Sequence, residues 1–348
     1  MSLMASSRKA KARTPSRGKL TLAKPGQLRG ESLRRVARRY RLQGKYKKAE
    51  SLYRRALSIA EKYFGRDHLE VAATLNELGI LYKYMARFGE AKRVYRRALS
   101  IMERSLDSGH PDIASLYHNL GGLEHARRRY ARGEPFARRA VEIREKALGL
   151  NHPDVAADIA ALAAILDGQK RFDESEKLYK RAIAIFEKEP GPNQYELAVN
   201  FNNLAALYQA KGKTGRAEQL YRRALATKER VLGENHPDVA MTLNNLAMLY
   251  EAMEKHAEAE PIYRRSLAIF KRRLGDAHPN ARVVLKNYTR LMRKFNKQEE
   301  AMKKDNKKAT QARKKVTVKD LKPEASSQVK GGLKGKTPQH NETLLRGV

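Results

Sequence analysis

The sequence contains no cysteine and no tryptophan among its 348 residues. The lack of cysteine excludes disulfide bonds, thiolate metal sites and a cysteine nucleophile. No stretch approaches the roughly 18 to 20 uninterrupted apolar residues that a membrane-spanning helix needs, and the N-terminus lacks the apolar segment of a secretory signal. We therefore expect a soluble, cytoplasmic protein.

Acidic residues are scarce relative to basic ones. Lys and Arg number 73 against 38 Asp and Glu, a net charge of +35. Residues 1–30 contain eight basic residues and no acidic one, and residues 302–348 contain 13 basic and 4 acidic ones. Their composition predicts disordered basic tails over 1–30 and 316–348, with a polar capping helix over 302–315.

Between the tails the sequence repeats itself every 42 residues. The pattern Tyr-Arg-Arg-Ala-Leu at 53–57 recurs in related form at 95–99, 137–141, 179–183, 221–225 and 263–267. The same step links His68, His110, His152, Gln194, His236 and His278, so no insertion interrupts the series. A period of 20–50 residues is typical of a solenoid of stacked units.

Each unit is predicted to contain two helices, A and B. In Leu243–Tyr250 the apolar residues fall at i, i+3, i+4 and i+7, which is one face of a helix A. Small residues recur on helix A where helix B must approach, at Gly79, Gly121, Ala163, Ala205 and Ala247. Helix B is expected to end at a glycine in the left-handed conformation: Gly65, Gly149, Gly191, Gly233 and Gly275.

Three motifs together closely resemble the kinesin light chain type of tetratricopeptide repeat. They are Leu-Asn-Asn-Leu-Ala from Leu243, Tyr-Arg-Arg-Ala-Leu from Tyr221, and Leu-Gly-x-x-His-Pro-Asp-Val-Ala from Leu232. The resemblance covers about 31–301 and implies an all-α fold, a right-handed superhelical solenoid. The long heptad coiled coil that precedes the repeats in kinesin light chains is lacking, so we do not expect a motor-subunit role.

The register gives six 42-residue repeats and a seventh helix A within 31–301. The first helix A, at about 31–43, should place Leu33, Val36, Ala37 and Tyr40 in the core. The seventh, at 279–295, should bury Leu285, Tyr288 and Met292.

Helical geometry assigns the residues opposite the core side of each helix A to a concave groove. This face is basic at both ends and lined with amides between them, with alanines at 157, 160, 161 and 164 as a floor. The predicted groove residues are Arg34, Arg38, Arg41, Asn76, Lys83, His118, Asn119, Asn202, Asn203, Asn244, Asn245, Asn287 and Arg290.

Regularly spaced amides can bind the main chain of an extended peptide, while Arg and Lys add charge-assisted bonds to carboxylate or phosphate. The resemblance implies the same, since kinesin light chain repeats bind short acidic peptides in this groove and the Asn pairs at 202–203 and 244–245 match their pattern. We therefore expect a non-catalytic adaptor or scaffold for an acidic or phosphorylated linear segment. In the alternative interpretation these amides only satisfy turns or neighbouring helices.

Other functions have weaker support. The regularly spaced histidines lie too far apart to share a metal ion, so no metal or other cofactor is expected. Residues 331–337 look like a phosphate loop but lack its first glycine and a preceding strand, and no catalytic constellation stands out. The main alternative is an association with nucleic acid or anionic membrane through the basic tails. A transit peptide at the N-terminus is a lesser alternative.

Overall fold

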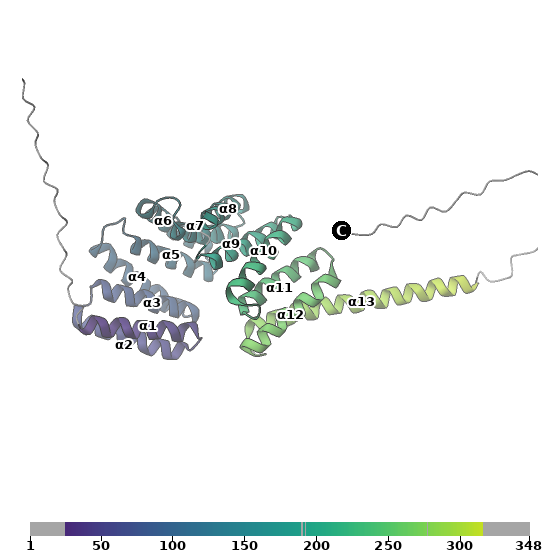
Figure 1. The fold of residues 1–348 in the computed structure, drawn as a ribbon, viewed down its shortest axis with the longest axis horizontal. Coiled ribbons are helices and arrows are strands. Elements are labelled where there is room, and N and C mark those ends of the chain that lie inside the picture. Colours follow the sequence, from purple (N-terminus) through teal and green to yellow (C-terminus); the bar gives the residue numbers. More distant parts are fainter. Residues whose placement is uncertain (1–24, 189–190, 192, 277, 316–348) are drawn as a thin grey trace, which may run out of the picture. The chain divides into compact units, whose positions relative to one another are not determined.

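In the computed structural model the described residues are 25–188, 191, 193–276 and 278–315. They form thirteen helices (Figure 1). In order these are α1 (Pro25–Leu42), α2 (Tyr46–Phe64), α3 (Leu69–Tyr84), α4 (Phe88–Ser105), α5 (Pro111–Ala126), α6 (Tyr130–Leu148), α7 (Pro153–Gly168), α8 (Phe172–Lys188), α9 (Gln194–Ala210), α10 (Thr214–Leu232), α11 (Pro237–Ala252), α12 (His256–Leu274) and α13 (Pro279–Lys315).

The helices pair as the 42-residue period predicts. Odd-numbered helices from α1 to α11 are the A helices, and each packs against the B helix that follows it. The described residues up to Leu291 form one compact unit, and those from Met292 onward form a second. No described helix is both long and apolar enough to cross a membrane.

The histidines that recur every 42 residues cap the A helices. The imidazole Nδ1 accepts the backbone N–H two residues later, at 3.1 Å from His68 to Glu70, 3.2 Å from His110 to Asp112 and 3.1 Å from His152 to Asp154. His236 and His278 make the same bond. Helix N-termini leave backbone N–H groups without intrahelical partners, and the imidazole satisfies one of them.

Close approach of helix B explains the small residues of helix A. A Cβ on Gly79 would lie 2.3 Å from Cε1 of Tyr95, the fully buried tyrosine of its own B helix. A Cβ on Gly121 would lie 3.3 Å from the backbone nitrogen of Ala137. Tyrosines at the same position of other B helices are also buried, at 53, 179, 221 and 263.

The glycines after the B helices differ from the expected left-handed caps. Gly65, Gly149, Gly233 and Gly275 have φ between 82° and 87° but ψ between 151° and 163°. That extended, positive-φ conformation is nearly confined to glycine, so the residue type is explained although the conformation was wrongly predicted. The fifth predicted cap, Gly191, lies three residues beyond Lys188, where α8 ends.

The terminal helices also depart from expectation. Val36 is 42% exposed and Leu285 is 44% exposed, although both were predicted to be core. Val36 lies on α1, and no described helix precedes α1 to cover it. Leu285 belongs to α13, which continues as one helix instead of turning back as a helix B. The predicted helix A and capping helix at the C-terminus are therefore one element. At the other end of the chain, α1 begins at Pro25, inside the tail that was predicted for 1–30.

Candidate functional site

The A helices form the inner wall of the solenoid. From α1 to α11, the backbone of each A helix lies close to that of the A helix in the next unit. The backbones of successive B helices in the described part lie farther apart and are bridged by ion pairs between long side chains, such as Arg97 to Glu61 at 2.7 Å. A stack whose A helices lie closer together than its B helices curves toward the A side. All thirteen predicted groove residues lie on A helices or on α13, and none lies on α7.

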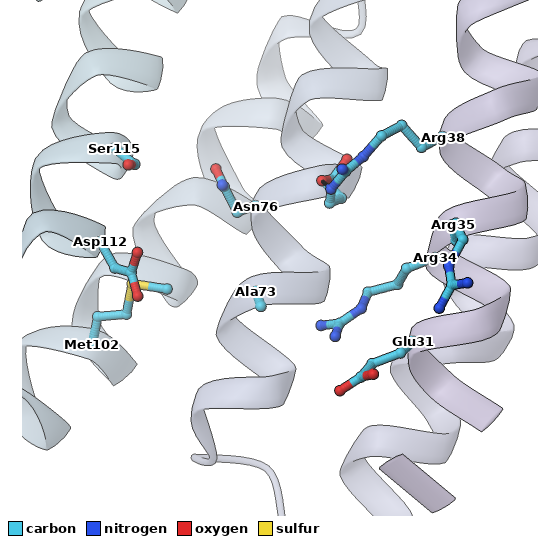
Figure 2. Close-up of a pocket in the computed structure, with 10 residues that line it drawn as sticks. Glu31, Arg34, Arg35, Arg38, Ala73, Asn76, Met102, Asp112 and Ser115 are labelled. Carbon is cyan, nitrogen blue, oxygen red and sulfur yellow. Dashed lines mark hydrogen bonds and ion pairs between the residues drawn. The ribbon is translucent and has the colours of Figure 1, made fainter. Parts of the chain in front are cut away.

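A cavity of about 400 Å³ opens at the N-terminal end of this wall, between α1, α3 and α5 (Figure 2). Arg34 and Arg38 extend from α1 toward α3, while Asp112 and Ser115 lie across the cavity on α5. Arg34 forms an ion pair with Glu70 at 2.8 Å, and Arg38 forms one with Glu77. These two arginines therefore contact acids of the next helix and are not unpaired cations.

Glu77 also contacts a residue of a B helix, Tyr53 on α2. The hydroxyl of Tyr53 donates to its Oε2 at 2.9 Å, and burial together with the charge of Glu77 raises the pKa of Tyr53 to about 12. The same arrangement recurs at the other end, where Arg290 donates two hydrogen bonds, at 3.1 and 2.9 Å, to the buried carboxylate of Glu251. Tyr263 donates to that carboxylate at 3.2 Å. Both ends of the wall are thus fixed by a Tyr–Glu–Arg cluster.

Six of the predicted asparagines form amide pairs between neighbouring A helices. In each pair Nδ2 of one residue donates to Oδ1 of a residue 43 positions earlier. The pairs are Asn119 to Asn76 at 2.8 Å, Asn245 to Asn202 at 3.1 Å and Asn287 to Asn244 at 3.0 Å. For these six the alternative interpretation, that the amides satisfy neighbouring helices, describes the observed contacts.

The amide ladder, as we call this series of pairs, is interrupted at α7. The positions that would continue it are occupied by Ala160 and Ala161. Asn203, which would donate to residue 160, therefore has no side-chain hydrogen bond to any residue that the structure describes. Its amide is half-buried, as are the alanines beside it.

His118 is held by a buried network that the sequence interpretation missed. Its Nδ1 lies 2.7 Å from Oδ1 of Asp158, a carboxylate only 2% exposed on α7. Arg144 on α6 donates from Nε to the other oxygen of Asp158 at 2.8 Å and from Nη2 to Ser115 at 3.1 Å. His118 is therefore fixed in orientation on the inner wall by groups from two helices.

The repeat alignment contains a signal for this network. Arg144 and Asp158 are 14 residues apart, and the equivalent pair two units later, Lys228 and Thr242, is also hydrogen-bonded, at 3.0 Å. One unit before Arg144 and Asp158 the equivalent residues are Met102 and Leu116, both buried and apolar. In these three units the two partners are both polar or both apolar. Phe186 and Asn200, one unit after Arg144 and Asp158, do not follow this rule, so the signal in the sequence is partial.

Arg41 and Lys83 complete the predicted residues. They occupy equivalent positions near the C-terminal ends of α1 and α3, and His125 occupies that position on α5. Burial, and the positive charge of Arg41, lower the pKa of Lys83. No carboxylate forms an ion pair with any of the three within the described ranges.

This geometry defines a class of protein, a solenoid of two-helix repeats that presents one face of its A helices as a wall. A sequence profile described as tetratricopeptide repeat matches residues 28–104, 112–188, 155–230, 196–272 and 238–307. The chain belongs to the tetratricopeptide repeat family. No curated protein matches the chain.

Solved structures with a similar fold include relatives of the kinesin light chain type. BtubC (BKLC) from P. vanneervenii is 23% identical with a TM-score of 0.53, over 73% of this chain and 94% of that one. A Rap protein complexed with competence and sporulation factor is 17% identical with a TM-score of 0.55, over 78% and 77%. Repeats described as kinesin light chain, from Podosopora anserina, are 23% identical with a TM-score of 0.49, over 60% and 98%.

Proposed function

We propose that the protein is a non-catalytic adaptor or scaffold that binds an acidic or phosphorylated linear segment of a partner protein along the inner wall. Solenoids of this kind present extended concave binding surfaces. The observation that carries the proposal is the interruption of the amide ladder at α7, which leaves one amide and an apolar surface available together.

The apolar surface consists of four alanines on one face of α7. Ala157, Ala160, Ala161 and Ala164 follow the i, i+3, i+4 and i+7 spacing that places residues on one side of a helix. All four are half-buried, and we call this surface the alanine floor. An apolar side chain of a bound peptide can lie on it without desolvating a polar group of the wall.

Asn203 lies on α9, the A helix next to the floor. A side-chain amide carries two donor hydrogens and an acceptor oxygen, so it can bind both the N–H and the C=O of an extended main chain. The paired asparagines each use part of this capacity on their neighbours, whereas Asn203 retains all of it. We therefore place the centre of the bound segment over α7 and α9.

The charge of the wall favours an acidic segment. Arg35 is exposed beside the cavity between α1, α3 and α5, and Arg41 and Lys83 lie on the same helices without an acid. Association through the basic tails with nucleic acid or an anionic membrane remains the alternative; residues 1–24 and 316–348 of these tails lie outside the described residues. We propose no cofactor and no metal for the chain, and its cytoplasmic location remains a prediction.

The test is a selection of random 15-residue peptides on the full-length protein, followed by affinity measurements on the selected peptide. We expect Asn203→Ala to weaken binding about tenfold, because a main-chain group of the peptide then loses its partner on the wall. Asn151→Ala removes an amide from the exposed turn before α7 and serves as the matched control.

Helical circular dichroism and the unfolding midpoint should be unchanged in both variants, since Asn203 bonds to no described residue. Equal affinity of the wild type and Asn203→Ala would contradict the position of the site. Failure to select any peptide, or binding that is lost only when residues 1–24 and 316–348 are removed, would favour the alternative function.

A further inference from the structure

We propose that Arg41, Lys83 and His125 form a site for one oxyanion, a carboxylate or a phosphate, carried by the bound segment. This inference rests on the proposed function and adds to it the position of the acidic group. We call these three residues the cation row.

Periodicity brings the cation row together. The three residues are 42 positions apart, on α1, α3 and α5, which are adjacent A helices. Lys83 reaches across to α5, where its Nζ lies 3.6 Å from the position that a Cβ on Gly122 would occupy. The Arg41 guanidinium lies 5.5 Å from the centre of the Tyr84 ring, and the His125 ring meets Tyr130 edge-on at 5.4 Å.

The positive charge of the row is not neutralised within the described ranges. Glu77, the acid of the same wall on α3, is already bonded to Arg38 and Tyr53. Burial and the charge of Lys83 lower the pKa of His125, and no carboxylate opposes this effect. Arg41 and Lys83, half-buried and without a described counterion, favour the binding of an anion, because the anion replaces the interaction with water that burial removed. A bound anion in turn favours the protonated form of His125.

Two buried polar atoms lie in the same part of the wall without a hydrogen-bond partner. They are Nε of Arg41 and the hydroxyl of Tyr95; burial raises the pKa of Tyr95, and the charge of Arg41 opposes that rise. Buried polar groups are nearly always hydrogen-bonded, so an orphaned pair of this kind indicates a ligand or water that is part of the site. Guanidinium, ammonium and imidazolium groups are all donors, and an oxyanion accepts from all of them.

The same position along the stack changes sign beyond α5. It is occupied by Asp167 on α7, Gln209 on α9 and Glu251 on α11. Burial raises the pKa of Asp167, and no described cation counteracts that rise. An oxyanion is therefore favoured over α1, α3 and α5 and disfavoured beside Asp167 on α7. This asymmetry gives the bound segment a direction.

The alanine floor lies two A helices beyond Lys83. Two steps of about 8–10 Å each correspond to about five or six residues of extended peptide at roughly 3.3 Å per residue. We expect the acidic group to lie about that many residues from the apolar side chain that occupies the floor.

The first experiment titrates the full-length protein with inorganic phosphate or with glutarate at constant ionic strength, following the ring resonances of His125 by NMR. We expect either anion to raise the pH midpoint of His125 in the wild type and not in Lys83→Gln. His110, an exposed helix cap, is the internal control. The anion that acts at the lower concentration identifies phosphate or carboxylate as the preferred group.

The second experiment repeats the peptide selection on Lys83→Gln. In the wild type we expect an enriched Asp, Glu or phosphoserine at a fixed distance from an apolar residue, and an affinity about tenfold higher than for Lys83→Gln. The selected peptide with that acid replaced by Gln should bind the wild type and Lys83→Gln equally. An unchanged His125 midpoint, an equal shift in Lys83→Gln or an equal shift of His110 would overturn the proposal.

The two proposals fail separately. Peptides that bind without involving His125 or Lys83 would overturn the cation row and leave the adaptor function intact. A shift of His125 with phosphate or glutarate in a protein that selects no peptide would support the anion site and contradict the adaptor function.

Discussion

Restoring the amide ladder across α7 should strengthen the stack and abolish peptide binding at the floor. Ala160 stands 43 residues before Asn203, the spacing of every observed amide pair. Ala160→Asn would therefore supply the acceptor that Asn203 lacks. The existing pairs bond at 2.8 to 3.1 Å, and such a bond contributes about 0.5–1.5 kcal/mol net.

The stability of Ala160→Asn alone would not show the contribution of the new hydrogen bond. Asparagine is about 0.6 kcal/mol less favourable than alanine inside a helix, which offsets much of the new bond. A double-mutant cycle with Asn203→Ala removes the propensity term, because both backgrounds carry it. We expect a coupling free energy of about 0.5–1.5 kcal/mol from urea unfolding.

Ala160→Asn should lower the affinity for the selected peptide about tenfold or more. The new side chain occupies the amide of Asn203 and places a polar group on the alanine floor. The affinity is measured by fluorescence anisotropy with full-length protein. A coupling free energy indistinguishable from zero would refute the ladder geometry. Unchanged peptide affinity in a variant with clear coupling would refute the role of the floor.

Two further predictions concern stability. Arg144→Met and Asp158→Leu should each lower the free energy of unfolding by about 1–3 kcal/mol, because each removes one hydrogen-bond partner of a buried charged group. The double change copies Met102 and Leu116, the equivalent residues one unit earlier, and should return the free energy of unfolding to near the wild-type value in urea unfolding. Glu134 is partly desolvated, yet hydrogen bonds from a glutamine and two arginines lower its pKa to about 2. A depressed pKa contributes stability that is fully present above the unfolded-state value and is lost as the pH falls through about 2. The stability difference between wild type and Glu134→Gln should therefore shrink from pH 5 to pH 2, and a difference independent of pH would contradict this.

The fold was predictable because its determinants are local and repeated. The 42-residue step, the small residues opposite the buried tyrosines and the apolar spacing of each helix A all act within one unit or between neighbours. The exceptions occur where the repetition stops. Val36 and Leu285 occupy core positions in register, but burial there needs a neighbouring helix, and none of the described helices covers them.

The inner wall was predictable as a set of positions but not as a set of interactions. Helical geometry identifies which residues face the wall, and it cannot show that Arg38 reaches Glu77 or that Asn119 pairs with Asn76, because those contacts depend on the offset between stacked helices. Asn203 differs from the paired asparagines because the residue 43 positions before it, Ala160, has no amide. Asp158 is buried and was therefore not among the residues assigned to the wall.

The central claim is that a peptide lies along the inner wall over α7 and α9. The most direct measurement places a photoreactive phenylalanine at the apolar position of the selected peptide, irradiates its complex with full-length protein and maps the cross-linked residues by mass spectrometry. Our account predicts cross-links to residues 157–164 and to the neighbourhood of Asn203. Cross-links confined to B helices or to the basic tails would contradict it.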